Sequence, residues 1–192
     1  MWLTDEEVKR NLLLFIYMWC CVSFSYYLVG FQIKYIKGNV YTNIMTSSIA
    51  DNIGTVASAV LYTKWGVRSA FQISLALTLL GGSAILLLHS FPFWMPLFIL
   101  LSKMGISSAF NLVFLANADL FPTLFSATAM GICNFFARLT TIAAPQVAER
   151  PEPFPMTLYL LLNVGAVLCV RQLRSQTSTK KVQAKEMRDT YI

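Results

Sequence analysis

Long apolar stretches alternate with short polar connections along this chain. Six of the stretches approach the roughly 20 apolar residues that a helix needs to cross the hydrocarbon core of a bilayer. Helix-breaking residues such as Gly38, Gly66, Pro92 and Pro122 lie between them. The pattern predicts an all-α membrane protein, a six-transmembrane-helix bundle with spans at 11–31, 41–62, 70–88, 93–117, 125–147 and 155–170, the last of which is short.

Basic residues outside these spans fall unevenly on the two sides of the predicted bundle. Residues 1–10 and the basic polar tail 171–192 flank the bundle 11–170, and six spans place both ends of the chain on one side. Because Lys and Arg accumulate on the cytoplasmic side of membrane proteins, that side is predicted to be cytoplasmic or its topological equivalent. It would hold Lys9, Arg10, Lys64, Arg68, Arg171, Arg174, Lys180, Lys181, Lys185 and Arg188, against Lys34, Lys37 and Arg150 on the other.

The composition supports a membrane protein and argues against an enzyme. Only 12% of the 192 residues are charged, about half the share in soluble domains. The net charge of +6 is explained by the cytoplasmic bias, so nucleic acid is not expected as a partner. The four cysteines lie in apolar stretches without metal-ligand spacing, and His89 is the single histidine. We therefore predict no metal, no cofactor and no catalytic residues.

Three ionisable residues lie deep inside predicted spans, namely Asp51, Lys103 and Arg138. A charge at the bilayer centre costs roughly 2.5–3.5 kcal/mol on insertion scales, so such residues should face a bundle interior or a wet cavity. By helical spacing Lys103 shares a face with Asn111, and Arg138 shares one with Asn134. Two interpretations stay open. The residues line a positively charged cavity suited to an anion or zwitterion, or they form a structural network in which Asp51 pairs with one base.

Three stretches resemble the organic cation/anion transporter family of the major facilitator superfamily. They are "GNVYTN" (38–43), which follows an aromatic span with the pair Tyr26-Tyr27, "SKMGISSAFNLVFLANADLFPT" (102–123) and "AMGICNFFARLTTIAAP" (129–145). Their order and spacing resemble spans seven to eleven of that family. The resemblance implies that the chain corresponds to the C-terminal half, spans 7–12, of such a transporter. It also implies that Asp51, Lys103 and Arg138 stand at family positions, the last near substrate in members that handle anions.

The same resemblance gives a role to Asp119, Lys64 and Arg68. In the family, an acid at the position of Asp119 joins basic residues in a gate at the cytoplasmic ends of the helices. Only part of that gate is present here, because Thr63, Val67 and Ser126 stand where the family carries an acid and two arginines. We interpret Asp119, Lys64 and Arg68 as the remnant of a weakened gate.

The chain begins ten residues before the first predicted span, and the first six-helix bundle of the family has no counterpart in it. Because substrate sites of this superfamily lie between two bundles, we expect another membrane protein chain or a second copy to cover the polar face, with an anionic lipid as a further candidate. Three interpretations follow: half of a split transporter, a non-transporting accessory subunit of a larger complex, or a fragment of a longer product. We favour the accessory subunit. The family resemblance implies the plasma membrane, whereas a recruited subunit would fit the mitochondrial inner membrane.

Overall fold

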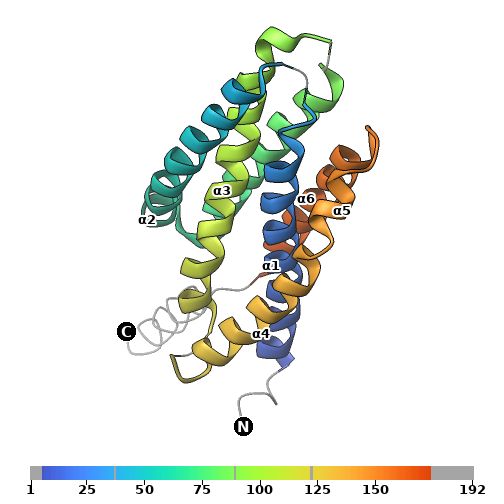
Figure 1. Ribbon diagram of the computed structural model, residues 1–192. Coiled ribbons are helices and arrows are strands. Elements are labelled where there is room, and N and C mark those ends of the chain that lie inside the picture. Colours follow the sequence, from blue (N-terminus) through green and yellow to red (C-terminus); the bar gives the residue numbers. More distant parts are fainter. Residues whose placement is uncertain (1–5, 37, 89, 122, 174–192) are drawn as a thin grey trace, which may run out of the picture.

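The computed structural model describes residues 6–36, 38–88, 90–121 and 123–173, and the ribbon in Figure 1 is helical over nearly all of them. The elements are α1 (Glu6–Gln32), α2 (Val40–Leu87), the 3-10 turn η2 (Pro92–Trp94), α3 (Met95–Leu120), α4 (Thr123–Thr141), α5 (Ala144–Ala148) and α6 (Phe154–Gln172). Most of the predicted tail 171–192 lies outside the described residues, but Arg171 and Gln172 still belong to α6.

Helix starts in this fold follow local sequence rules. Proline occupies one of the first two positions of α3, α5 and α6, where its missing N–H costs nothing. At the start of α2 the side chain of Asn39 accepts a hydrogen bond from the backbone N–H of Tyr41 at 2.9 Å. This cap satisfies one of the donors that a helix N-terminus leaves free.

The longest helix, α2, consists of two arms. Its 48 residues are interrupted at Gly66, whose φ of 74° and ψ of 174° are not helical and suit a residue without Cβ. Ser107 and Asn111 of α3 contact Asp51 and Thr55 of the first arm, so that arm runs parallel to α3. The second arm runs antiparallel to α3, as shown by Ser74–Ser108 and by Gly81 against Ser102. The arms therefore run in opposite directions, as Figure 1 shows.

Glycine brings the backbones of α2 and α3 into close contact. A Cβ at Gly81 would lie 2.2 Å from the backbone nitrogen of Ser102, and a Cβ at Gly105 would lie 2.5 Å from that of Thr78. Small residues are the usual means by which membrane helices approach one another. Between the glycines, Ser74 and Ser108 share a buried hydrogen bond of 2.8 Å. We call this glycine- and serine-rich contact the α2–α3 seam.

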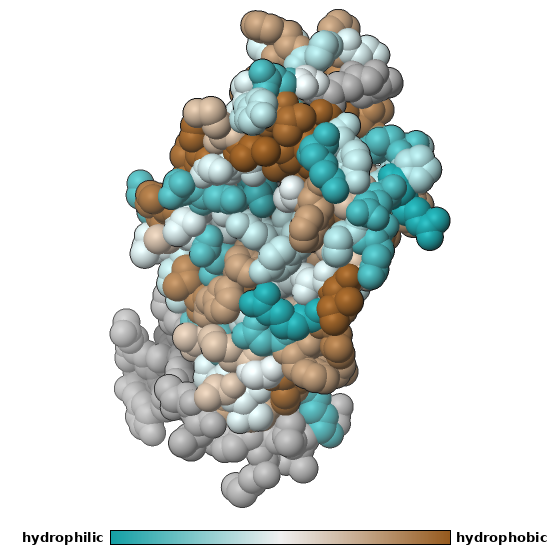
Figure 2. Space-filling view, in the orientation of Figure 1, coloured by the Kyte–Doolittle hydropathy of each residue, from teal (hydrophilic) through white to brown (hydrophobic). Residues whose placement is uncertain are grey.

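Helix α1 occupies the middle of the bundle and contacts α3, α4, α5 and α6. It packs antiparallel to α3 through aromatic pairs, with Trp19 against Phe114 at 5.0 Å and Phe15 against Phe121 at 5.7 Å between ring centroids. Phe71 of α2 is fully buried in the same core. Many large apolar side chains point outward instead, and Figure 2 shows apolar and hydrophilic patches mixed over the visible face.

Among the described residues, four helical segments are long and apolar enough to cross a membrane: 9–32, 40–87, 92–120 and 154–172. They make the chain a membrane helical bundle. The predicted spans 41–62 and 70–88 both correspond to parts of α2, which ends at Leu87. The predicted span 125–147 is not continuous, because α4 ends at Thr141 and Pro145 opens the separate helix α5. Neither piece is among the four candidate spans, and α4 carries the polar residues Asn134 and Arg138.

Candidate functional site

Lys103 lies buried where α1, α2 and α3 meet. Its side chain is 4% exposed, and its Nζ lies 3.7 Å from Oδ1 of Asp51 in the first arm of α2. Nζ also donates a hydrogen bond of 3.3 Å to the backbone carbonyl of Tyr26 and lies 3.6 Å from the centroid of the Tyr26 ring. An opposite charge, a carbonyl and an aromatic face together compensate the desolvation of this ammonium group.

Asp51 completes the network from the other side. The Tyr26 hydroxyl donates to Oδ2 of Asp51 at 3.3 Å, and the Ser107 hydroxyl donates to the Asp51 backbone carbonyl at 3.3 Å. One turn further on, Asn111 donates to Oγ1 of Thr55 at 3.2 Å. The structure thus brings together three predicted site residues, Asp51, Lys103 and Asn111, along one line of contact between α2 and α3.

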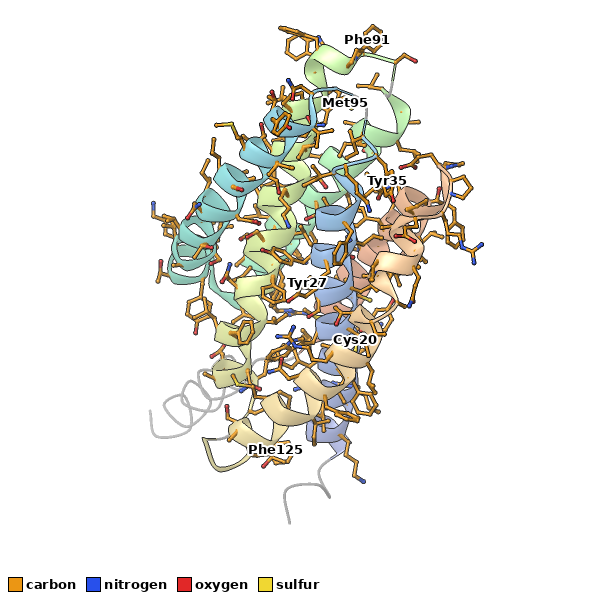
Figure 3. The ribbon with its side chains drawn as sticks, in the orientation of Figure 1. Cys20, Tyr27, Tyr35, Phe91, Met95 and Phe125 are labelled. Carbon is orange, nitrogen blue, oxygen red and sulfur yellow. The ribbon has the colours of Figure 1, made fainter. Side chains whose placement is uncertain are left out.

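Arg138 has a different environment on α4. The residue is exposed, and its Nη1 donates a hydrogen bond of 3.0 Å to the hydroxyl of Tyr27. Asn134, one turn earlier, is half-buried. Figure 3 shows Tyr27 near the middle of α1. Arg138 therefore sits at the α1–α4 contact with a neutral hydroxyl as the partner that the structure gives it.

The pair Tyr26-Tyr27 connects the two basic residues. The two rings meet edge to face with centroids 5.5 Å apart, and Tyr26 also stacks on Phe110 of α3 at 4.9 Å. Lys103 contacts Tyr26 while Arg138 contacts Tyr27. Tyr26 and Tyr27 belong to the resemblance described above but were not predicted as site residues. The available signal was two adjacent tyrosine hydroxyls within a predicted span.

The surface of α4 has three sides. Ala129, Cys133 and Ala137 are buried and face the bundle. Arg138 belongs to an exposed small and polar stripe with Ala127 and Gly131, and a Cβ at Gly131 would meet no atom within 4 Å. A second exposed stripe is apolar, with Phe136 at 44%, Leu139 at 51% and Ile142 at 65%. Helix α4 thus presents a polar stripe and an apolar stripe outward, while a third side of small residues packs inward.

The residues assigned to a gate lie at the end of the bundle where α1 begins and α6 ends. Lys64 and Arg68 are exposed on α2, and Arg68 donates a hydrogen bond to the backbone carbonyl of Arg171 in α6. Asp119 of α3 interacts electrostatically with Tyr62 of α2. Two positions that the resemblance assigned to gate arginines now pack within the chain: Val67 is 5% exposed, and Ser126 accepts two hydrogen bonds from Asn117.

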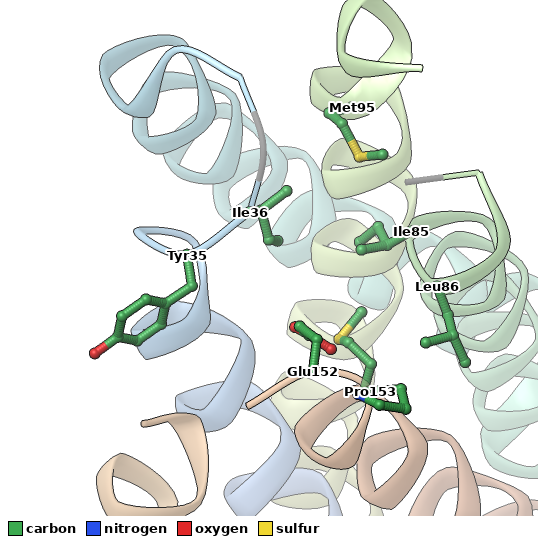
Figure 4. Close-up of a pocket in the computed structure, with 8 residues that line it drawn as sticks. Tyr35, Ile36, Ile85, Leu86, Met95, Glu152 and Pro153 are labelled. Atoms are coloured by element: carbon green, nitrogen blue, oxygen red, sulfur yellow. The ribbon is translucent and has the colours of Figure 1, made fainter. Parts of the chain in front are cut away.

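A pocket of about 320 Å³ lies at the opposite end of the bundle, away from all the predicted site residues. Figure 4 shows Ile36, Ile85 and Met95 around it, with Glu152 entering from the segment before α6. The side chain of Gln32 donates a hydrogen bond to the Glu152 carboxylate. Although Glu152 is exposed at its outer edge, desolvation against the apolar pocket raises its pKa above 4.5, and the bond from Gln32 opposes this shift.

Comparison with known proteins relates the chain to transporters. It is 26% identical over 158 residues to solute carrier family 22 member 4 of Mus musculus, covering 79% of this chain and 28% of that protein. It is 30% identical over 154 residues to solute carrier family 22 member 15 of Xenopus tropicalis, covering 74% and 28%. With the human organic cation/carnitine transporter 2 it shares 23% over 143 residues, covering 72% and 25%.

The chain spans less than a third of the length of these relatives. No family model matches it. Similarity over about three quarters of the chain to several solute carriers, together with its apolar helices, makes it a transporter-like integral membrane protein.

Proposed function

We propose that this chain forms a six-span bundle equivalent to the C-terminal half of a major facilitator transporter, and that it acts as a non-transporting accessory subunit of a larger membrane complex. The observation that carries the proposal is the exposed polar stripe of α4 around Arg138. A guanidinium group facing lipid near the centre of a bilayer costs roughly 2.5–3.5 kcal/mol. One hydrogen bond to a neutral tyrosine offsets only part of that cost, so the stripe needs a protein cover.

The helix lengths support six spans. At 1.5 Å per residue, the arms of α2 on either side of Gly66 are about 39 Å and about 32 Å long, and α4 with its 19 residues is about 28 Å long. Each approaches the roughly 30 Å of the hydrocarbon core. The antiparallel course of the two arms fits two crossings better than one helix of about 72 Å.

The internal contacts favour a subunit that does not rock. The ion pair of Asp51 and Lys103 lies within the chain's own bundle. Tyr26 contacts both partners, because its hydroxyl donates to Asp51 and its backbone carbonyl accepts from Lys103. At the gate, buried Val67 and hydrogen-bonded Ser126 occupy positions where the resemblance expects arginine. A subunit with a fixed orientation needs no lock that opens and closes. Such recruitment would fit the mitochondrial inner membrane.

A second candidate function is supported by the charge balance near the tyrosine pair. Lys103 and Arg138 approach Tyr26 and Tyr27 from two sides, whereas Asp51 is the acid that the structure places in this network. This excess of positive charge suits an anion or zwitterion. In that case the chain is half of a split or dimeric organic-ion transporter, expected in the plasma membrane, and Arg138 lines its cavity.

Photo-crosslinking in native membranes tests the proposed cover. Crosslinking residues are placed at Asn134 on the polar stripe and at Phe136 on the apolar stripe of the same helix. We expect protein adducts from position 134 and mainly lipid adducts from position 136. Lipid adducts from both positions would remove the physical basis of a subunit interface.

Uptake assays distinguish the two candidate functions. The purified chain, and the complex recovered by gentle extraction, are reconstituted into liposomes with labelled organic anions, cations and zwitterions. An accessory subunit gives no uptake that depends on Arg138. Uptake that is abolished by Arg138→Ala would contradict the accessory role and support the transporter half.

A further inference from the structure

Three arginines converge on a second pocket, at the end of the bundle where α1 begins. The pocket has a volume of about 470 Å³ and is lined by Arg10 of α1, Arg68 of the second arm of α2, and Arg171 and Gln172 of α6. These residues are far apart in sequence, so the tertiary fold creates the cluster. Arg68 bonds to the carbonyl of Arg171, which holds two of the arginines together and satisfies a carbonyl in the last turn of α6.

The arginine pocket has unbalanced positive charge. Among the described residues, the lining contains no carboxylate, and none of the three guanidinium groups forms an ion pair with an acid. Like charges held close together repel one another, and a bound anion relieves that repulsion.

The donor chemistry and the depth of the pocket both point to phosphate. Guanidinium groups present planar forks of N–H donors that match phosphate oxygens in bidentate geometry. The candidate membrane span of α1 begins at Lys9, and that of α6 ends at Gln172. The pocket therefore lies where these spans give way to the polar interface. Phospholipid head groups occupy this level, and soluble phosphates reach it from the water.

We propose that Arg10, Arg68 and Arg171 form a binding site for a phosphate group, supplied by an anionic phospholipid or by a soluble phosphate. The inference rests on the pocket alone and is independent of the proposed accessory role. If the pocket binds no phosphate, the proposed protein cover on the polar stripe of α4 is not contradicted. If Asn134 gives lipid adducts, the proposed phosphate site is not contradicted.

Native mass spectrometry of the full chain in detergent, titrated with phosphatidic acid or phosphatidylcholine, tests the site. We expect saturable binding of phosphatidic acid, whose phosphate carries no choline, at least about tenfold tighter than that of phosphatidylcholine. Arg68→Gln should weaken binding by about tenfold or more, because it removes a charge-assisted hydrogen bond. Arg10→Gln tests the same site without disturbing the bond to Arg171, so it covers the case in which Arg68→Gln fails to fold.

Matched variants and a competitor complete the test. Lys64→Gln removes an exposed base of the same helix that does not line the pocket, and it should leave the affinity within about twofold. Competition by millimolar inorganic phosphate would identify a soluble ligand, and its absence would identify the lipid. Equal affinity for both lipids, or equal losses for Lys64→Gln and Arg68→Gln, would overturn the proposal in favour of diffuse electrostatic attraction.

Discussion

Two basic residues in apolar helices are held in opposite ways in this molecule. Lys103 is buried between three helices, with the Asp51 carboxylate, a backbone carbonyl and an aromatic ring around it. Arg138 is exposed on α4 and bonds to the neutral hydroxyl of Tyr27. Adjacent tyrosines of α1 serve both, so the two environments are neighbours. The contrast separates a charge that the chain compensates by itself from one that depends on its surroundings.

The physical consequence concerns what each residue can do. The Lys103–Asp51 pair lies at the contact of α2 and α3, where a buried charge left without its partner would be costly. Arg138 contributes little to that packing, and its charge remains available to another chain, a lipid or an anion. Substitutions at the Lys103–Asp51 pair should therefore lower the stability of the chain, whereas substitutions at Arg138 should mainly change its association with other molecules.

The largest effect is expected from Asp51→Asn. The variant removes the carboxylate and leaves Lys103 charged and buried. Because Asp51 itself is 31% exposed, we expect a loss at the lower end of the cost of breaking a buried pair, about 3 kcal/mol. Urea or thermal unfolding of the detergent-solubilised chain, followed by circular dichroism, measures the loss. In the double variant Asp51→Asn/Lys103→Met both charges are gone, so most of the stability should return. An unchanged midpoint for Asp51→Asn would show that the pair does not contribute to the fold.

How far the sequence could predict this contrast depends on the kind of residue. Charged residues in apolar stretches are visible in a sequence, so Asp51, Lys103 and Arg138 could be selected. Helical spacing placed Asn111 on the face of Lys103. Which base pairs with Asp51 could not be predicted, because it depends on how α2 packs on α3. The Gly66 break was predicted as a turn between spans, since glycine marks such turns directly.

Other features of the site arise from packing and carry weak sequence signals. The buried side of α4 consists of Ala129, Cys133 and Ala137, residues too small to stand out in a hydropathy pattern. The arginine pocket assembles positions 10, 68 and 171, which the sequence could place on one side of the membrane but not in contact. Tyr26 and Tyr27 were visible in the sequence, but their partners on α3 and α4 became known only from the fold.

The second prediction compares two glycines, one from each environment. Gly81→Ala places a methyl group 2.2 Å from the backbone of Ser102, so the α2–α3 seam must open, at a cost of about 2 kcal/mol. Gly131→Ala on α4 meets no atom within 4 Å and should be neutral or stabilise the isolated chain by up to about 1 kcal/mol through helix propensity. Parallel unfolding measurements of both variants test this, and equal losses would contradict the open stripe.

The third prediction is that Arg138→Leu leaves the unfolding free energy of the solubilised chain within about 0.5 kcal/mol, as expected for an exposed position. Its effect should appear in association, since the polar stripe loses its charge. The complex recovered by gentle extraction should therefore be depleted of partner relative to wild type, with Leu139→Ala on the apolar stripe as the matched control. Loss of stability comparable to Asp51→Asn would show that Arg138 is part of the fold after all.

The smallest effect concerns Glu152, an acid that, like Arg138, has a neutral partner rather than an opposite charge. Because burial raises the pKa of Glu152 above 4.5, the folded state binds its proton more tightly than the unfolded state does. Stability from this group is therefore fully present below pH 4.5 and is lost as the pH rises through the folded pKa. Unfolding midpoints of wild type and Glu152→Gln, measured between pH 4 and pH 7, should converge at the acidic end and separate slightly toward neutrality, with the variant the more stable. If the two curves stay parallel throughout, the pocket does not desolvate the carboxylate. A wild type that gains stability over Glu152→Gln toward neutral pH would mean that Gln32 stabilises the ionised form more than burial opposes it.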